Sequence, residues 1–186
     1  MNESKLNVTI KGITPLLMNR PDMLDITDKA KKKKSGEDKL TKQFKEKQYL
    51  TSEGKLYTPA THIRGALIQA GKQIKVKGKG KATYSKIIGY AVMVEPEAII
   101  HKNQKLERHV VLGVNPNTRG RVAICRPMLK EWELDFQITF DSEEIPIEVI
   151  EEALNTAGKT VGIGDWRPAT KGIYGRFITT KLKEVS

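Results

Sequence analysis

The chain has 186 residues, enough for one domain with a sizeable core. It carries 33 lysines and arginines against 22 aspartates and glutamates, which gives a formal net charge of +11. This balance favours an anionic partner, nucleic acid first, because the field of a basic protein attracts polyphosphate chains. The single cysteine, Cys125, excludes an internal disulfide and a cysteine-based zinc cluster, and we expect it to be a small buried side chain.

The sequence has no apolar leader, and no stretch approaches the roughly 20 apolar residues of a membrane span. We therefore expect a cytoplasmic protein without a membrane partner. Near the N-terminus, Leu6, Val8 and Ile10 alternate with polar residues, which predicts a half-buried strand.

The composition changes over residues 20–48, which contain the run Lys31–Lys34 and few large apolar side chains. Such a segment buries too little surface to order itself, so we expect a mobile basic insertion, partly helical near residues 40–49. A solvated loop and a binding arm both remain open as its role.

A helix is predicted over residues 59–74. Thr58 and Pro59 have the residue types of a cap and a first helical position, and Ile63 and Leu67 fall on one helical face. The basic stretch 75–81 that follows contains two glycines and no carboxylate, which indicates an exposed loop.

The middle of the chain is rich in short apolar runs. Residues 87–94 are compatible with a strand or a short helix, and residues 98–100 with the end of a strand. Turn residues near 115–120, flanked by two apolar runs, predict a hairpin within residues 101–128.

The C-terminal third has the clearest pattern. Apolar and polar residues alternate strictly over 132–140, which predicts a strand. Pro146 is placed to open a second helix and Gly158 to close it, and residues 173–182 are predicted to form the last strand.

Without its insertions, the predicted order is strand, helix, strand, strand, helix, strand. This is the α+β, ferredoxin-like plan shared with the RNA-recognition motif, with two helices on one face of a sheet. We expect a single domain over 1–186, with insertions at 20–48 and 101–128, and we find no internal repeat.

The run from Val161 to Phe177 interleaves four glycines with cationic and aromatic side chains. Glycines let a backbone lie close to a ligand, cationic groups attract phosphate, and aromatic rings stack on bases. The run therefore predicts a loop that contacts phosphates and bases through Trp166, Arg167, Lys171, Tyr174 and Arg176.

Common catalytic motifs fail in this sequence. Gly158-Lys-Thr160 resembles the end of a P-loop, but Ala153 stands where the motif requires its first glycine, and a predicted helix, not a strand, precedes the motif. Gly162-Ile-Gly164 begins like a dinucleotide-binding fingerprint, but Arg167 stands where the third glycine is required. The three histidines, His62, His101 and His109, are scattered, so we expect no metal, no cofactor and no catalytic residue. Asp165 is a candidate base or metal ligand, although an ion pair with Arg167 is the favoured interpretation.

Two further segments extend the cationic surface. One is the lysine loop, with Lys75, Lys77, Lys79 and Lys81, and the other is the predicted turn with Arg119 and Arg121. Many phosphate contacts give affinity that is independent of sequence and weakens with salt. The first strand lacks the aromatic signature of an RNA-recognition motif, so we expect binding through loops and not through the sheet.

Three segments resemble the RAMP superfamily, whose ferredoxin-like subunits form the backbone of CRISPR RNA-guided effector complexes of antiviral defence. The first strand and residues 12–18 are similar to the family's opening strand and loop. The segment 57–67, Tyr-Thr-Pro-Ala-Thr-His-Ile-Arg-Gly-Ala-Leu, is similar to its entry into the first helix, and 162–177 to its C-terminal glycine-rich loop.

The resemblance implies a non-catalytic subunit that associates with copies of itself, and with other effector subunits, along a single-stranded guide RNA. It also implies that the hairpin 101–128 is a projecting thumb and that Arg64, Arg167, Lys171 and Arg176 contact RNA. The chain is shorter than most such subunits, its Asp-Trp-Arg-Pro motif is unusual, and no carboxylate aligns with the family's RNA-cleaving acidic residue. A guide-processing endoribonuclease of the same superfamily and a phage single-stranded DNA-binding or assembly protein remain alternatives.

Overall fold

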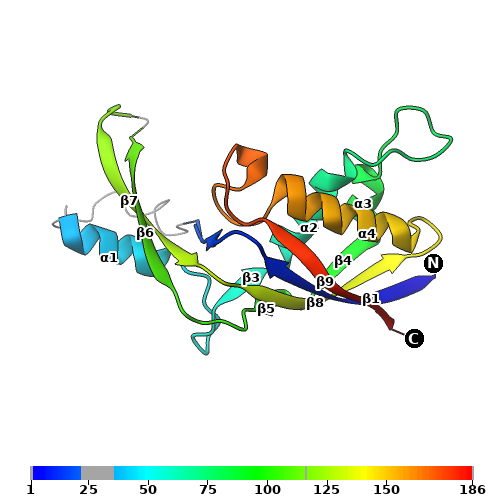
Figure 1. The fold of residues 1–186 in the computed structure, drawn as a ribbon, viewed down its shortest axis with the longest axis horizontal. Helices are drawn as coiled ribbons and strands as arrows, with labels where there is room; N and C mark the ends of the chain where they lie inside the picture. Colours follow the sequence, from blue (N-terminus) through cyan, green and yellow to red (C-terminus); the bar gives the residue numbers. More distant parts are fainter. Residues whose placement is uncertain (1, 22–35, 116, 186) are drawn as a thin grey trace.

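The computed structural model describes residues 2–21, 36–115 and 117–185. Its centre is an antiparallel four-stranded sheet (Figure 1). The strands lie in the order β4 (Val92–Glu95), β8 (Glu133–Asp141), β1 (Glu3–Gly12), β9 (Phe177–Val185).

Two strand–helix–strand units interleave in this sheet. Helix α2 (Ala60–Gly71) connects β1 to the chain leading to β4, and α4 (Ile147–Thr156) lies between β8 and β9 in sequence. The two strands of each unit are separated in the sheet by a strand of the other unit. Both helices, together with the short α3 (Ser85–Ala91), lie on the same face of the sheet (Figure 1).

The hydrophobic core fills the space between this sheet face and the helices. Alternation buries one side of each central strand, for example Leu134, Phe136 and Ile138 of β8, while helical spacing buries Ile63 and Leu67 of α2. Polar and charged residues cover the other face of the sheet.

A second body projects from one end of the sheet (Figure 1). It is a hairpin of β6 (Glu107–Val114) and β7 (Arg121–Leu129), to which the short β2 (Leu16–Leu17) adds a third strand. Helix α1 (Gly36–Glu46) packs on β7. The Gln43 side-chain oxygen accepts a 2.8 Å hydrogen bond from the Cys125 amide, and the Arg108 guanidinium lies 5.4 Å from the Phe44 ring centroid.

A two-stranded ladder of β3 (Tyr57–Pro59) and β5 (Ala98–Ile100) connects the sheet to this second body. Just after β5, His101 is buried, and its Nε2 lies 2.9 Å from the hydroxyl oxygen of Thr58. The predicted burial of Cys125 is confirmed, and burial raises the pKa of its thiol.

Several predicted boundaries shift for identifiable reasons. Pro59 is not the first helical residue: its backbone is extended, with ψ of 137°, and it ends β3. The stretch 87–94, for which strand and helix were both open, contains the end of α3 and then β4. The helical residues of the predicted insertion run from 36 to 46, earlier than the predicted 40–49, while residues 22–35 of that insertion lie outside the described chain.

Gly158 does not close the second helix, as its residue type predicts. The chain continues as a π-helical turn, η1 (Ala157–Val161), and turns away at Gly162, where φ is +69°. Gly158 instead lies against β9: a Cβ there would be 2.1 Å from the Phe177 carbonyl oxygen. The last strand begins at Phe177 and not at residue 173, because residues 173–176 belong to the preceding loop.

Candidate nucleic-acid interface

The glycine-rich loop, residues 162–176, is folded tightly on itself. The Ile163 amide donates to the Gly175 carbonyl at 3.0 Å, and the Tyr174 amide donates to the Trp166 carbonyl at 3.2 Å. A Cβ on Gly172 would lie 1.7 Å from the Trp166 carbonyl oxygen, and one on Gly175 would lie 1.8 Å from the Ile163 carbonyl oxygen. Glycine is required at both positions, so the loop holds a defined shape.

Two side-chain links attach this loop to the hairpin. Arg126 of β7 forms an ion pair with Asp165, and both side chains are largely shielded from solvent. The Tyr174 hydroxyl lies 3.0 Å from Nε2 of His109 on β6. Partial burial and then the nearby Arg126 charge lower the pKa of His109, which keeps the ring neutral at physiological pH.

The Arg126 ion pair corrects one prediction. Asp165 has an ion-pair partner, but that partner is Arg126 and not its neighbour Arg167. Arg167 instead donates from Nη1 to the Gly164 carbonyl at 3.2 Å, so it helps to fold its own loop.

Three exposed side chains stand on strained backbone. In the described chain, the non-glycine residues with positive φ are Arg119 at 54°, Trp166 at 51° and Lys171 at 63°. Such conformations are uncommon for residues with a Cβ, and they cluster at functional sites. All three belong to the set that the sequence predicts to contact nucleic acid.

Cavities surround the glycine-rich loop. His62 and Arg167 line two of them. One, of about 220 Å³, lies between the loop and the segment 16–21, and the other, of about 190 Å³, lies between the loop and α2. Tyr49 meets His62 edge to face, with ring centroids 5.4 Å apart. Burial, and then the charge of Arg167, lower the pKa of His62. A third cavity, of about 320 Å³, lies between the loop and the hairpin.

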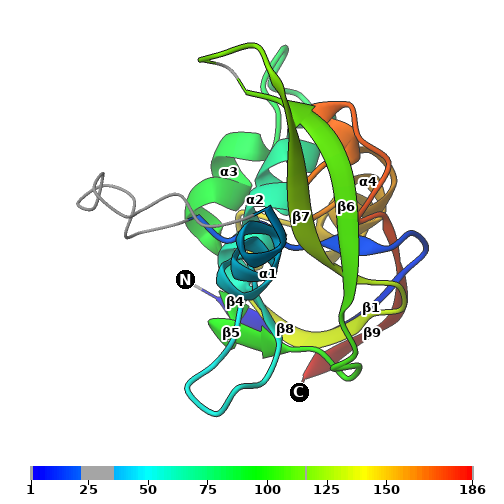
Figure 2. The ribbon, with the colours of Figure 1, turned by 90° about the vertical axis from the view of Figure 1, so that its left-hand side faces the viewer.

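The cationic segments predicted from the sequence project on the same side of the sheet as the helices. Figures 1 and 2 show the tip of the hairpin, the glycine-rich loop and the loop between α2 and α3 all rising on that side. Their exposed cations include Lys75, Lys77, Lys79, Lys81, Arg119, Arg121, Lys171 and Arg176. None of these forms an ion pair with a carboxylate of the described residues.

The lysine loop has its own internal order. The Val76 amide donates to the Ala82 carbonyl at 2.9 Å, and the Tyr84 amide donates to the Ile74 carbonyl at 3.0 Å. Its lysines are exposed, so their charges are available to a ligand.

Arg64 lies apart from these segments. Its Nε donates to the Val92 carbonyl at 3.1 Å, and its Nη2 donates to the Gly89 carbonyl. These bonds tie α2 to α3 and to β4, which forms one edge of the sheet.

The contacts that His62, His109, Arg126 and Asp165 make do not follow from the sequence. The alternation of the hairpin strands contains a signal for two of them, since His109 and Arg126 are paired in register and therefore share a face. Nothing in the sequence pattern indicates which loop that face meets.

Within the described ranges, no group of three or more histidine, cysteine or acidic side chains is arranged to hold a metal ion. No helix in those ranges is both long and apolar enough to cross a bilayer.

Comparison with known proteins gives a likeness in structure alone. No family model matches the sequence, and no curated protein matches it. The structure resembles a chain from the cryo-EM structure of the Type III-B Cmr-beta bound to cognate target RNA, with a TM-score of 0.60 and 12% sequence identity. The likeness shows a shared fold. It covers 99% of this chain and 61% of the matched chain, so this chain spans less than two thirds of the length of the chain it matches.

Proposed function

We propose that this protein is a non-catalytic RNA-binding subunit of the RAMP type, which associates with copies of itself along a single-stranded guide RNA. The observation that carries the proposal is that the three cationic segments rise on the same side of the sheet (Figure 1). Two of these segments also contain exposed residues on strained backbone, namely Arg119, Trp166 and Lys171. Strained backbone clusters at functional sites, and cations that rise on one side can contact phosphates of the same strand.

The fold supports the same proposal. Two interleaved strand–helix–strand units, with helices on one face, are the arrangement of a ferredoxin-like core. We assign the projecting hairpin of β6 and β7 as the thumb that the RAMP resemblance implies. The likeness to a chain of an RNA-bound Type III-B complex supports RNA as the partner, other effector subunits as neighbours, and the cytoplasm as the location.

The mechanism is electrostatic clamping. Phosphates bind the lysine loop, the hairpin tip and Arg167, Lys171 and Arg176 of the glycine-rich loop, while Trp166 and Tyr174 offer aromatic surface. The aromatic-poor sheet face takes no part. We leave Arg64 out of this interface, because backbone carbonyls engage both its Nε and its Nη2, whereas Arg167 uses only Nη1 for a backbone carbonyl.

Replacing Arg167 and Arg176 together by alanine tests the proposal. Affinity for a short single-stranded RNA should fall, and the slope of log affinity against log salt should decrease by about 0.7 for each lost phosphate contact. Fluorescence anisotropy across a salt series measures both quantities.

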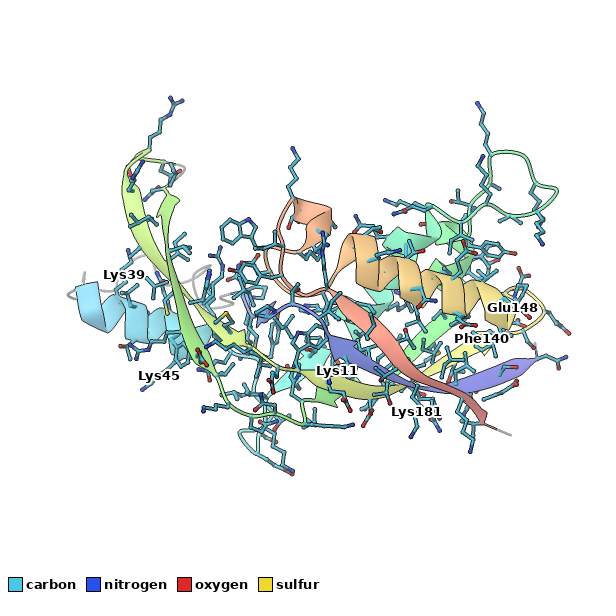
Figure 3. The ribbon with its side chains drawn as sticks, viewed as in Figure 1. Lys11, Lys39, Lys45, Phe140, Glu148 and Lys181 are labelled. Carbon is cyan, nitrogen blue, oxygen red and sulfur yellow. The ribbon has the colours of Figure 1, made fainter. Side chains whose placement is uncertain are left out.

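A matched control removes the same charge elsewhere. Lys11 and Lys181 lie on the sheet face away from the helices (Figure 3), and replacing both by alanine should leave the slope unchanged. Equal effects of the two double variants would show that only net charge matters and would refute the assigned interface.

RNA cleavage is the second candidate, because His62 and Arg167 line one cavity, where burial and then the Arg167 charge lower the pKa of His62. A neutral imidazole can act as a general base, and a guanidinium can stabilise a charged phosphate. Incubation with labelled hairpin RNA in the absence of metal separates the candidates, since only an enzyme yields a discrete product.

Competition between RNA and DNA of equal length tests the DNA-binding alternative, because the 2′-hydroxyl is the basis for a preference.

A further inference from the structure

The connection between β1 and β2 lies against the end of the glycine-rich loop. Backbone hydrogen bonds join the two segments: the Ile13 amide donates to the Arg176 carbonyl at 2.9 Å, and the Gly175 amide donates to the Pro15 carbonyl at 2.8 Å. A side chain adds a further bond, because the Thr14 hydroxyl oxygen accepts from the Arg176 amide at 2.9 Å. The backbone of Arg176 is therefore held at both its N–H and its C=O.

The Thr14 hydroxyl supplies a bond that the sheet does not. The ladder between β1 and β9 begins at the pair of Gly12 and Phe177, so Arg176 lies one residue outside it. An amide beyond the end of a ladder needs water or a side chain as its acceptor. Thr14 provides that acceptor and thereby extends the order of the sheet into the last residue of the loop.

Thr14 is itself fixed from two directions. The buried Trp132 donates from its indole Nε1 to the Thr14 carbonyl at 2.8 Å. Gly12 leaves room for that indole, since a Cβ there would lie 2.1 Å from Nε1. Pro15 disfavours a helical backbone at the residue before it, which restricts Thr14 to extended conformations. A rigid support therefore presents the hydroxyl to Arg176.

The Arg176 side chain is exposed, and it forms no ion pair with a carboxylate of the described residues. A long side chain loses conformational freedom when it binds a phosphate, and a fixed backbone reduces the total loss. Because Thr14 bonds to the Arg176 amide, its hydroxyl acts on the guanidinium by fixing the chain that carries it.

We propose that Thr14 is a positioning residue for Arg176: its hydroxyl fixes the backbone from which the guanidinium reaches a phosphate of the bound strand. This assignment rests on the proposed RNA binding and adds to the interface a residue outside the three cationic segments. It also gives a role in binding to the connection 13–15, which carries no charge of its own.

Thr14→Val tests the assignment, because valine has nearly the shape of threonine and lacks the hydroxyl acceptor. With a short single-stranded RNA, the slope of log affinity against log salt should fall by up to about 0.7, the loss of one phosphate contact. Affinity should fall by no more than the factor measured for Arg176→Ala. Thr14→Ser keeps the hydroxyl and should restore both quantities, which fluorescence anisotropy across a salt series measures.

A double-variant cycle separates positioning from a general loosening of the loop. Thr14→Val should have no further effect on binding once Arg176→Ala is present, whereas its effect should add to that of Lys171→Ala. A loss that persists in the Arg176→Ala background would show that the whole loop had moved, and it would overturn the assignment.

Thr180→Val is the matched control. The Thr180 hydroxyl donates to the Thr9 carbonyl at 3.3 Å between β9 and β1, further along the strands from the loop. This variant removes one threonine hydroxyl between the same two parts of the chain, so it should bind RNA as the wild type does. A change of salt slope equal to that of Thr14→Val would contradict a specific role of Thr14.

The two proposals fail in different ways. Salt-dependent RNA binding with the same slope for Thr14→Val and the wild type would overturn the role of Thr14 and leave the proposed function intact. Absence of RNA binding by the wild type would overturn the proposed function, and the role of Thr14 with it.

Discussion

His101 lies buried between β5 and the chain leading to β6, and its surroundings favour the neutral ring. Burial lowers its pKa to about 4, well below the value of 6.5 for a free histidine. Nε2 is paired with Thr58, but Nδ1 is buried without a partner among the described residues. A proton on the folded protein would therefore place an uncompensated charge in the interior.

This environment predicts acid sensitivity with a definite sign. As the pH falls from 6.5 towards 4, the unfolded chain takes up a proton that the folded protein refuses, so the free energy of unfolding decreases, by up to about 3 kcal/mol. Above pH 6.5 this contribution is constant. Urea denaturation at a series of pH values measures it.

His101→Gln is the control, because an amide can still bond to Thr58 and does not titrate in this range. The variant should lose stability less steeply than the wild type over the same pH interval. Parallel curves for the two proteins would contradict the assignment, since the remaining slope would then come from carboxylates alone.

Three other residues are distinguished by a strained backbone. A left-handed backbone costs a residue with a Cβ about 1–2 kcal/mol, and glycine avoids this cost. Arg119, Trp166 and Lys171 nevertheless occupy such positions with exposed side chains. Stability alone favours glycine at all three, which supports the role that we propose for these side chains in binding RNA.

At the scale of elements, the glycine-rich loop depends on backbone contacts that no side chain tolerates. We expect Gly175→Ala to destabilise the protein strongly, because the new Cβ would lie 1.8 Å from a backbone oxygen on a residue with φ of +68°. The midpoint of thermal unfolding measures this effect, and RNA affinity should fall with it.

Gly54→Ala separates the cost of a left-handed backbone from the cost of a steric clash. Gly54 has φ of +76° and nothing within 4 Å of an added Cβ, so its substitution carries the conformational cost alone, about 1–2 kcal/mol. Gly175→Ala should lower the unfolding midpoint clearly further. Similar shifts for both variants would mean that the loop relaxes easily and does not hold Trp166 rigidly.

The elements that the sequence predicts well are those with a strict period. The alternation over 132–140 corresponds to β8, and the apolar face of 59–74 to α2, because both patterns record burial against one core. The packing of α1 on the hairpin could not be predicted, since its polar contacts include the Gln43 side chain on the Cys125 amide of β7 and Arg108 of β6 over the Phe44 ring. Polar contacts of this kind produce no periodic pattern in the sequence.

The candidate site was likewise predictable only in part. Glycines, cations and aromatics concentrated in one run pointed to the glycine-rich loop. The partner of Asp165 did not follow, because Arg126 is distant in sequence and only the folded hairpin brings it to the loop. The role of Arg64 also depends on tertiary structure, since the backbone carbonyls it bonds are those of α3 and β4.

For the molecule as a whole, the distribution of charge matters more than the net value of +11. The open face of the sheet mixes both signs: Lys102 is paired with Glu133 and Asp135 across it. On the helix side, the three cationic segments lack such partners among the described residues. We therefore expect a polyanion to bind at these three segments, and successive copies bound to one strand to present the same side to it.

Self-association along RNA predicts that the mass of the complex grows with the length of the strand. Each doubling of RNA length should about double the number of bound copies, because every copy occupies a fixed run of phosphates. Analytical ultracentrifugation of the protein with single-stranded RNAs of increasing length measures the copy number. Replacing Arg119 and Arg121 together by alanine should weaken the longer assemblies most, because every bound copy then loses the same phosphate contacts. One copy per RNA at every length would contradict self-association, while leaving single-copy binding through the glycine-rich loop in place.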